Sequence, residues 1–340
     1  MSITTVKIST PSQPVRVGVV GAGKMGSNHL RIYGGLKGVE LVGVVDADAD
    51  CALHAAARHG CRVFASVREM AGEIDAASIA VPSTLHADVA GPLLERGVHC
   101  LVEKPLATTE ADCEALIAAA ESSGAVLLVG HVERFNPVVR QLGEILRGNV
   151  VHAVDVRRMS ALSARITDVD VVADLMIHDL DVVLSLLGTD VTDVFAQGVS
   201  NAGDAGHDYV TATLMFAGGS MATLTASRIT HNKIRELNVT ADIGFITASY
   251  LTQELLIHSQ ARTSGSTGDG GSSYVLDLAI ERVLIRPGEP LDIEIRHFID
   301  AVRGESAPLV SGRDGLNAMR FVWEIQRLLA GQGMGAPCPT

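Results

Sequence analysis

The chain has 340 residues, of which 47% are apolar and 19% charged, and its formal net charge is -12. This length favours two domains, and the apolar content excludes an intrinsically disordered protein. The acidic balance, without any block of lysine and arginine, argues against nucleic acid as a partner, although a locally basic pocket could still take an anionic substrate.

The cysteines and the apolar runs narrow the class of protein further. Five cysteines are present, an odd number, and no pair has C-x-x-C spacing, so we expect neither a disulfide framework nor a zinc knuckle. We find no signal-peptide pattern at the start and no apolar run approaching about 20 residues. We therefore expect a cytoplasmic protein without a membrane partner.

The first feature in chain order is the stretch VRVGVVGAGKMG, which follows a Ser/Thr/Pro-rich tail over residues 1–14. An apolar strand from Val15 to Val20 leads into G-x-G-x-x-G at Gly21–Gly26. In this motif the first glycine makes a tight turn, the second lets a pyrophosphate approach the backbone, and the third lets the next helix pack on the strand. The helix N-terminus then directs free N–H groups at the phosphates. The pattern predicts a dinucleotide site, although an ordinary strand–turn–helix without a ligand is the alternative.

A second apolar strand ends in Asp46, twenty residues after Gly26. A carboxylate at this spacing accepts hydrogen bonds from the adenosine ribose and repels a 2′-phosphate. No arginine follows Asp46 directly. We therefore expect NAD rather than NADP as the cofactor.

Strands and helices alternate as far as residue 130, with strands at Ala76–Val81, Val98–Val102 and Ala125–Val129. This alternation predicts a Rossmann doubly wound parallel sheet over residues 15–130, in which ligands lie at the carboxyl ends of the strands. The cofactor-binding candidates in and near these positions are Gly21, Gly23, Lys24, Met25, Gly26, Asp46, Pro82, Ser83, His86, Glu103, Lys104 and Pro105.

The pattern changes after residue 130. Asn136-Pro137 begins a helix, 171–187 is apolar and helical, and β-rich runs follow one another from Val191 to His258. Two helices are expected near the end, and the Gly/Ser/Thr-rich residues 261–273 are expected to form a mobile loop. We predict an α+β domain over residues 131–340 with an open, mainly antiparallel sheet.

Two groups of residues could carry chemistry. Lys104 ends a core strand, where its ammonium could polarise a carbonyl or move a proton, or could simply reach to solvent. Asp174 and His178 are four apart and would share one helix face, so the carboxylate could orient the imidazole as a general base. A structural Asp–His pair, or a metal site completed by Asp181, are the alternatives; because no second histidine or cysteine is near, we predict no metal.

Four motifs together resemble the Gfo/Idh/MocA family of NAD(P)-dependent sugar and inositol oxidoreductases: GAGKMG at Gly21–Gly26, VPSTLH at Val81–His86, EKP at Glu103–Pro105 and D-x-x-x-H at Asp174–His178. The resemblance implies that Lys104, Asp174 and His178 form the catalytic group, with hydride passing to the nicotinamide. It also implies a cis Lys104-Pro105 bond. Which of Lys104 and His178 acts as the base stays open.

A narrower resemblance rests on GHVERFNP at Gly130–Pro137, on DVDVV at Asp168–Val172 and on DLMIHDLD at Asp174–Asp181. These segments are similar to those of bacterial members of the family that oxidise the 3-hydroxyl of UDP-N-acetylglucosamine, in some bacteria for a 3-amino sugar of lipid A. Members acting on inositols or other UDP-sugars share parts of the pattern. A non-catalytic NAD sensor, and an enzyme that eliminates or hydrolyses through transient oxidation, are further alternatives.

A UDP group needs cationic or amide donors for its diphosphate, and the second domain offers Arg157, Arg158, Arg165, Arg228 and Arg235. Strand alternation places Arg157 and Arg158 on opposite faces, so one of them at most should face a given pocket. The predicted substrate-binding residues are Lys104, His131, Glu133, Arg134, Asn136, Arg165, His178 and Arg228. The family resemblance further implies a homodimer or homotetramer built through the open sheet.

Overall fold

A computed structural model describes residues 13–161, 170–200, 206–266 and 272–331, and the contacts among them divide the chain into two compact units. The first unit comprises residues up to Leu128 together with Ile295–Pro308, and the second comprises Val129–Glu294 and the residues from Leu309 onward. The predicted tail lies almost wholly outside the described residues. The boundary predicted at residue 130 stays a prediction.

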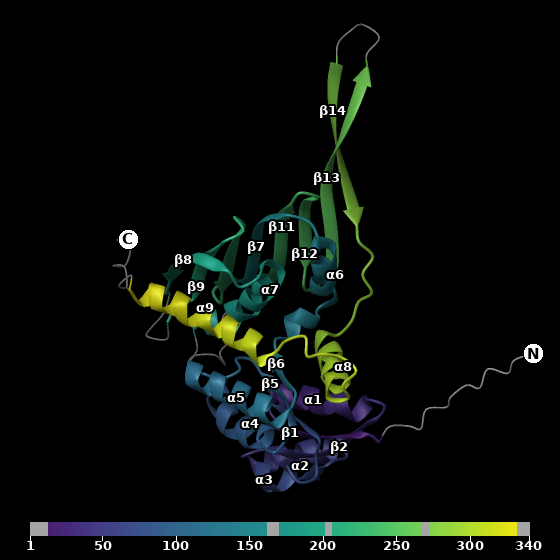
Figure 1. Cartoon of the computed structure of the whole chain (residues 1–340), viewed down its shortest axis with the longest axis vertical. Coiled ribbons are helices and arrows are strands. Elements are labelled where there is room, and N and C mark those ends of the chain that lie inside the picture. Colours follow the sequence, from purple (N-terminus) through teal and green to yellow (C-terminus); the bar gives the residue numbers. More distant parts are fainter. Residues whose placement is uncertain (1–12, 162–169, 201–205, 267–271, 332–340) are drawn as a thin grey trace, which may run out of the picture. The chain divides into compact units, whose positions relative to one another are not determined.

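The first unit is built on a six-stranded sheet in the order β3-β2-β1-β4-β5-β6 (Figure 1), and the strand pairings that the structure gives for it are parallel. Its strands are β1 Val15–Val20, β2 Val39–Val45, β3 Arg62–Val63, β4 Ala76–Ile79, β5 His99–Glu103 and β6 Leu127–Gly130. Its helices are α1 Lys24–Gly35, α2 Ala49–His59, α3 Val67–Met70, α4 His86–Leu94 and α5 Glu110–Ser123. The predicted Rossmann sheet is confirmed, with the order reversing between β1 and β4, where such sheets bind ligands.

Local sequence accounts for the ends of these helices. The side chain of Asp48 accepts from the N–H groups of Asp50 and Cys51 at the start of α2, and Gly60 ends that helix in the left-handed conformation. Thr109 caps α5 in the same way, and Gly124 ends it. The strands β1, β4, β5 and β6 are mostly buried apolar runs because helices cover both faces of the sheet.

The second unit is built on an eight-stranded sheet in the order β14-β13-β12-β11-β7-β10-β9-β8. Its strands are β7 Val151–Met159, β8 Val191–Val199, β9 Tyr209–Phe216, β10 Met221–Ser227, β11 Ile234–Ala241, β12 Gly244–Ser249, β13 Glu254–Ser266 and β14 Ser272–Arg282. All neighbouring strands pair antiparallel except β7 and β10. The predicted mainly antiparallel α+β domain is confirmed.

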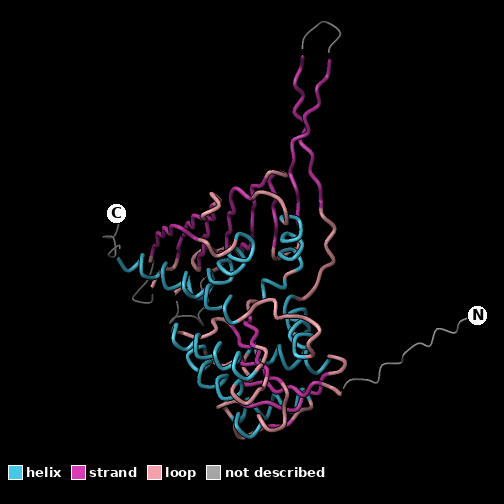
Figure 2. The backbone as a smooth tube through the Cα atoms, in the orientation of Figure 1, coloured by secondary structure: helices cyan, strands magenta, loops and turns pink. Residues whose placement is uncertain are grey.

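Helices cover one face of this second sheet (Figure 2). They are α6 Pro137–Leu146, α7 Ile177–Leu187 and α9 Gly312–Gly331, whereas α8 Pro290–Val302 begins in the second unit and continues into the first. Alternate sheet residues such as Val154, Val156 and Leu224 join the helices in one core. The residues between them, such as Thr223, point to the opposite face, which in the described structure is covered by no helix of this unit.

Two expectations for the second unit were wrong in detail. Residues 261–266 and 272–273 belong to strands β13 and β14 rather than to a loop, and residues 267–271 of the expected loop lie outside the described part. The strand β14 was missed, because its Gly/Ser-rich start hides the apolar alternation that follows. Antiparallel pairing with β13, which no local signal reports, makes this segment extended.

Candidate active site

The glycine-rich loop has the shape that a pyrophosphate requires. Gly21 has φ of 95°, and a Cβ placed on it would lie 2.5 Å from the carbonyl oxygen of Ala80. A Cβ on Gly26 would collide with the backbone of Gly21, whereas a Cβ on Gly23 would have no atom within 4 Å. The loop is therefore tight where strand and helix meet and open at Gly23, where phosphate oxygens can approach.

Asp46 lies directly against this loop. Its Oδ2 accepts from the N–H of Ala22 at 2.5 Å, and its Oδ1 accepts from the N–H of Asp48 at 2.8 Å. The helix α1 has no side-chain cap at Gly23, so its first N–H groups stay available for an anion. The exposed Lys24 and the half-buried Met25 begin the same helix.

These residues fit a dinucleotide. The N-terminus of α1 and Gly23 would hold the diphosphate, and Asp46 would hold a ribose, while bound NAD supplies the hydride acceptor. On the neighbouring strand end, Pro82 and Ser83 begin a 3-10 turn, Ser83–Leu85, after β4. The structure thus brings these predicted cofactor residues to one edge of the first sheet.

The corner Glu103-Lys104-Pro105 follows β5 at the same edge, and its Lys104-Pro105 bond is cis, as expected. His86 is 1% exposed, and its ring nitrogens lie 2.8 Å from the carbonyl oxygen of Pro105 and 3.0 Å from that of Val81. His86 therefore connects the segment that follows β5 with the segment that follows β4 through its two ring nitrogens. Its predicted direct contact with the cofactor stays a prediction.

A chain of buried hydrogen bonds also reaches the carboxylate of Glu103. The hydroxyl of Tyr33 lies 2.8 Å from that of Ser78, which lies 2.9 Å from Nδ1 of His29. The Nε2 of His29 lies 2.8 Å from Oε1 of Glu103. If each hydroxyl donates toward His29, its Nε2–H donates to the carboxylate, and every group in the chain is satisfied. The chain links the helix of the phosphate loop to the residue before Lys104.

In the second unit, Asp174 and His178 lie at the junction of two helical turns. Residues Val172–Met176 form a π-helical turn, and α7 begins at Ile177. The helix predicted over residues 171–187 is therefore present, but its segment Val172–Met176 is π-helical rather than α-helical. Both side chains are half-buried. Single π turns occur often at functional sites, which agrees with the predicted role of this segment.

The residue after His178 anchors α7 through a buried ion-pair cluster. Arg158 on β7 donates to both oxygens of Asp179, at 2.7 Å each, and to Oε1 of Glu133 at 2.9 Å. Its guanidinium carbon lies 5.2 Å from the centre of the Tyr250 ring. Burial lowers the pKa of Arg158, but the nearby carboxylates of Asp179 and Glu133 raise it by more than burial lowers it. The net pKa is above the usual value, so the guanidinium stays charged.

Three predicted substrate residues, Glu133, Arg134 and Asn136, bond other residues of the chain. Asn136 caps α6 and donates from its side chain to Glu133 and to the carbonyl oxygen of Tyr250. Arg134 donates to Asp181 at 3.3 Å and to the carbonyl oxygen of Leu309. Their contacts with a substrate stay predictions.

The other predicted substrate residues lie in separate parts of the chain. Arg228 is buried and donates to Asp208 at 2.6 Å, and His131 is buried behind the end of β6. Arg165 lies outside the described residues. Lys104 belongs to the first unit and His178 to the second.

Of the two neighbouring arginines on β7, Arg157 lies on the opposite face from Arg158 and pairs with Glu236 at 2.9 Å, as strand alternation predicts. Arg235 is half-buried. Burial and the neighbouring Arg158 lower its pKa, and the carboxylates of Asp179, Glu133 and Asp174 oppose this shift only in part. Its guanidinium donates to the backbone carbonyl oxygens of Met159 at 2.7 Å and of Ile234 at 2.9 Å. Among the described residues, no group of three or more His, Cys, Asp or Glu is arranged to hold a metal ion.

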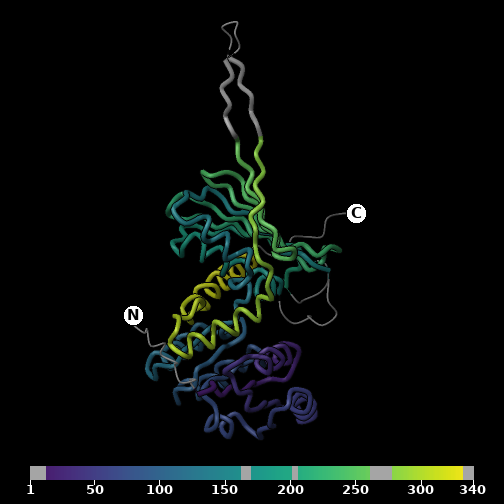
Figure 3. The backbone as a smooth tube through the Cα atoms, turned by 90° about the vertical axis from the view of Figure 1, so that its right-hand side faces the viewer, coloured from purple at the N-terminus to yellow at the C-terminus, as the bar shows by residue number. Residues whose placement is uncertain are grey.

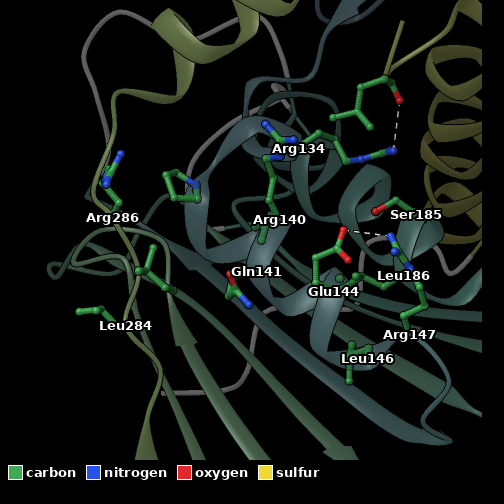
Figure 4. Close-up of a pocket in the computed structure, with 15 residues that line it drawn as sticks. Arg134, Arg140, Gln141, Glu144, Leu146, Arg147, Ser185, Leu186, Leu284 and Arg286 are labelled. Atoms are coloured by element: carbon green, nitrogen blue, oxygen red, sulfur yellow. Dashed lines mark hydrogen bonds and ion pairs between the residues drawn. The ribbon is translucent and has the colours of Figure 1, made fainter. Parts of the chain in front are cut away.

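A separate groove of about 700 Å³ lies beside α6 (Figure 4). Its charged lining includes Arg134, Arg140, Arg147 and Arg286, of which Arg147 pairs with Glu144. Lys104, Asp174 and His178 do not line it. The groove is therefore distinct from the candidate catalytic group.

Sequence reasoning missed the supporting residues more than the reactive ones. The buried polar residues of the hydrogen-bond chain are His29 and Tyr33 on α1 and Ser78 on β4. A single polar residue in an apolar element does not indicate, in the sequence, which residue it will bond. Asp179 and Arg158 are 21 residues apart in the chain and meet only in the folded sheet. One signal was available in the sequence. Asp174, Asp179 and Asp181 lie close to His178 in an otherwise apolar helix, and buried carboxylates need cationic partners.

The fold and the glycine loop with Asp46 define a dinucleotide-binding protein. The chain belongs to the Gfo/Idh/MocA oxidoreductase family: the family's NAD-binding Rossmann model matches residues 15–131, and the model of its C-terminal alpha/beta domain matches residues 163–327. It is an NAD-dependent dehydrogenase, as the sequence predicted. In the part of the chain that the structure describes, no helix is long and apolar enough to span a membrane.

Among its relatives, the chain is 31% identical to UDP-N-acetylglucosamine 3-dehydrogenase of Acidithiobacillus ferrooxidans, over 92% of this chain and 96% of that protein. A solved structure of that enzyme aligns with a TM-score of 0.85 over 93% of this chain and 98% of the other, at 30% identity. The chain is also 30% identical to inositol 2-dehydrogenase 2 of Paenarthrobacter aurescens, over 90% of this chain and 93% of that protein.

Proposed function

We propose that this enzyme oxidises the 3-hydroxyl of UDP-N-acetylglucosamine to a ketone and transfers the hydride to NAD. The observation that carries the proposal is the similarity to the enzyme of that activity over nearly the whole length of both chains, in sequence and in fold. The segments GHVERFNP and DLMIHDLD, on which the narrower resemblance rests, form the cluster around Arg158 and the start of α7.

In this reaction the carbon loses a hydride and its hydroxyl loses a proton, so the chain must accept the proton and stabilise negative charge on oxygen. We assign these tasks to Lys104 and His178, with Asp174 orienting the imidazole. One of the two takes the proton while the other donates a hydrogen bond to the oxygen. Arg158 and Asp179 hold the start of α7 rigidly, which keeps His178 in place.

An inositol or another sugar is the second candidate substrate, because relatives that oxidise inositol match the chain along a comparable length. The two substrates differ in the diphosphate, which requires cationic or amide donors. Arg235 on β11 is a described candidate for that purpose, because it is half-buried and the hydrogen bonds that the structure gives it go to backbone carbonyl oxygens, those of Met159 and Ile234, rather than to a carboxylate.

The test is a panel of UDP-sugars and inositols offered with NAD and followed by NADH absorbance. We expect the highest kcat/KM with UDP-N-acetylglucosamine, and a keto sugar equimolar with NADH in the product. A preference for an inositol would overturn the substrate assignment. Product without net NADH would indicate transient oxidation, and no turnover with any member of the panel would favour an NAD sensor.

We further propose that the enzyme works as a homodimer or homotetramer through the uncovered face of the second sheet. A sheet face without helices exposes a broad surface that association would bury. Phe195 and Val199 on β8 are exposed there, at 62% and 60%. A cytoplasmic location and a role in making a 3-amino sugar for lipid A remain predictions that accompany this function.

A further inference from the structure

The groove beside α6 is lined by residues of the second unit alone. Its walls come from α6, from the C-terminal end of α7 and from the segment 283–289, which connects β14 to α8 (Figures 1 and 3). Arg134, in the 3-10 turn Val132–Phe135, and Leu309 complete the lining. Its volume of about 700 Å³ is in the range of sites that bind small molecules.

The charges along the groove are mostly positive. Four arginines line it, and the carboxylate among the described lining residues is that of Glu144. Two of the arginines are paired, one with Glu144 and one with the buried Asp181. Arg140 and Arg286 are exposed, and within the described part of the chain neither of them makes an ion pair. On a chain of net charge -12, this local excess of positive charge attracts an anion to the groove.

The two unpaired guanidinium groups come from separate segments. Arg140 lies in the middle of α6, whereas Arg286 belongs to the connection between β14 and α8, and Figure 4 shows both beside the groove. Arginine binds phosphate through two parallel N–H donors, and each phosphate group offers several acceptor oxygens. A diphosphate therefore suits the pair better than a single carboxylate, because each arginine can take one phosphate group.

Aliphatic side chains provide much of the remaining lining, and two of them are exposed. Leu284 is 97% exposed and Leu309 is 37% exposed. A ligand with an aliphatic body would remove this surface from water. Among the described lining residues there is no aromatic ring on which a nucleotide base could stack. The lining thus favours an anion with an aliphatic body over a nucleotide.

We propose that the groove is a binding site for an organic diphosphate with an aliphatic body, in which Arg140 and Arg286 hold the diphosphate while Leu284 and Leu309 cover the body. The site is separate from the oxidised carbon of the substrate, since Ser185 in its wall lies about two turns, roughly 10 Å, further along α7 than His178. The proposal does not depend on which sugar the enzyme oxidises.

The test is isothermal titration calorimetry on the full-length protein saturated with NAD, so that the glycine loop is occupied. The probes are geranyl diphosphate and inorganic pyrophosphate. We expect geranyl diphosphate to bind more tightly, because its chain covers Leu284. Arg140→Gln and Arg286→Gln should each weaken its binding by about 10-fold or more, the loss expected for hydrogen bonds to a charged group. Arg327→Gln, which removes an exposed arginine of the same unit outside the groove, is the matched control and should bind as the wild type does.

Two further variants separate the parts of the site. Arg235→Met removes a candidate for the diphosphate of the substrate, so it should leave the binding of geranyl diphosphate unchanged. Leu284→Ser should reduce the advantage of geranyl diphosphate over pyrophosphate. Circular dichroism and the unfolding midpoint verify the folding of each variant.

Four results would each overturn the proposal. They are no binding of geranyl diphosphate, equal affinity for the two probes in the wild type, unchanged binding in both Arg140→Gln and Arg286→Gln, and an equal loss in Arg327→Gln. A loss confined to Arg235→Met would instead place the diphosphate in the substrate site, and it would overturn the proposal as well.

Discussion

At the scale of single residues, the reactive groups are few and their supports are many. Lys104 directly follows the end of β5, which is held by the hydrogen bonds of His86 and by the chain of hydrogen bonds through His29 to Glu103. His178 lies in the first turn of α7, next to Asp179, whose carboxylate accepts hydrogen bonds from Nε and Nη2 of Arg158. A reactive side chain held by such partners needs little reorganisation when substrate binds.

The first prediction concerns the reactive pair. Lys104→Ala and His178→Ala should each lower kcat by roughly 10²- to 10⁴-fold, because each removes a proton-transfer or oxygen-stabilising group from the transition state. Binding of NAD, measured by calorimetry, should persist in His178→Ala, since His178 lies outside the Rossmann unit. The exposed Lys37→Ala and His54→Ala are matched controls that should turn over normally. Near wild-type kcat in both catalytic variants would remove Lys104 and His178 from the mechanism.

At the scale of elements, α7 is joined to the sheet by charges rather than by apolar packing alone. Arg158 from β7 and Asp179 from α7 have side chains exposed by only 5% and 3%. Glu133 and Tyr250 complete the surroundings of the guanidinium. Such a cluster adds little net stability compared with apolar side chains, but it becomes costly when one member is removed.

The second prediction follows from this asymmetry. Arg158→Met should lower the free energy of unfolding by about 3–5 kcal/mol, because Asp179 is left buried without a cation. The double variant Arg158→Met with Asp179→Leu should lose less than the sum of the two single variants. Arg157→Met, on the same strand but half-exposed, should cost at most about 1 kcal/mol. Urea unfolding measures the stability of the three single variants and of the double variant. Equal losses for Arg157→Met and Arg158→Met would contradict the predicted cost of leaving Asp179 buried without a cation.

At the scale of the whole molecule, stability should depend on pH through Asp181. Burial raises the pKa of this carboxyl to about 7, and Arg134 offsets only part of the increase. Between pH 4 and 7 the folded protein therefore holds a proton that the unfolded chain releases. Folding stability should fall as pH rises through this window and then level off above pH 7.

The third prediction tests this linkage with Asp181→Asn, whose amide does not titrate. Relative to the wild type, this variant should gain unfolding free energy between pH 4 and 7, by about 1.4 kcal/mol for each unit by which the pKa is raised. Arg134→Met should extend the window to higher pH, because it removes the cation that favours the ionised form. Unfolding curves at several pH values provide the measurement. Parallel pH profiles for the wild type and Asp181→Asn would contradict the raised pKa.

Also at this scale, the fold could be predicted from the sequence further than the site. The alternation of strands and helices up to residue 130 and the succession of strands after it both reflect periods that burial imposes locally. The class of each sheet, parallel and then mainly antiparallel, was therefore predicted correctly. Strand β14 was missed because its first residues have no apolar period and become strand only through pairing with β13. The π turn before His178 was missed because it leaves no mark in a helical sequence.

The sequence by itself determined the dinucleotide site, because the glycine spacing and Asp46 are fixed by local geometry that any strand–turn–helix must obey. It also determined the reactive residue types and, through the family motifs, the class of reaction. Only the tertiary structure decided which arginines are structural and which ends of the strands His86 joins. These are contacts between residues far apart in the chain, and their partners are chosen by the packing of the folded protein rather than by their neighbours in sequence.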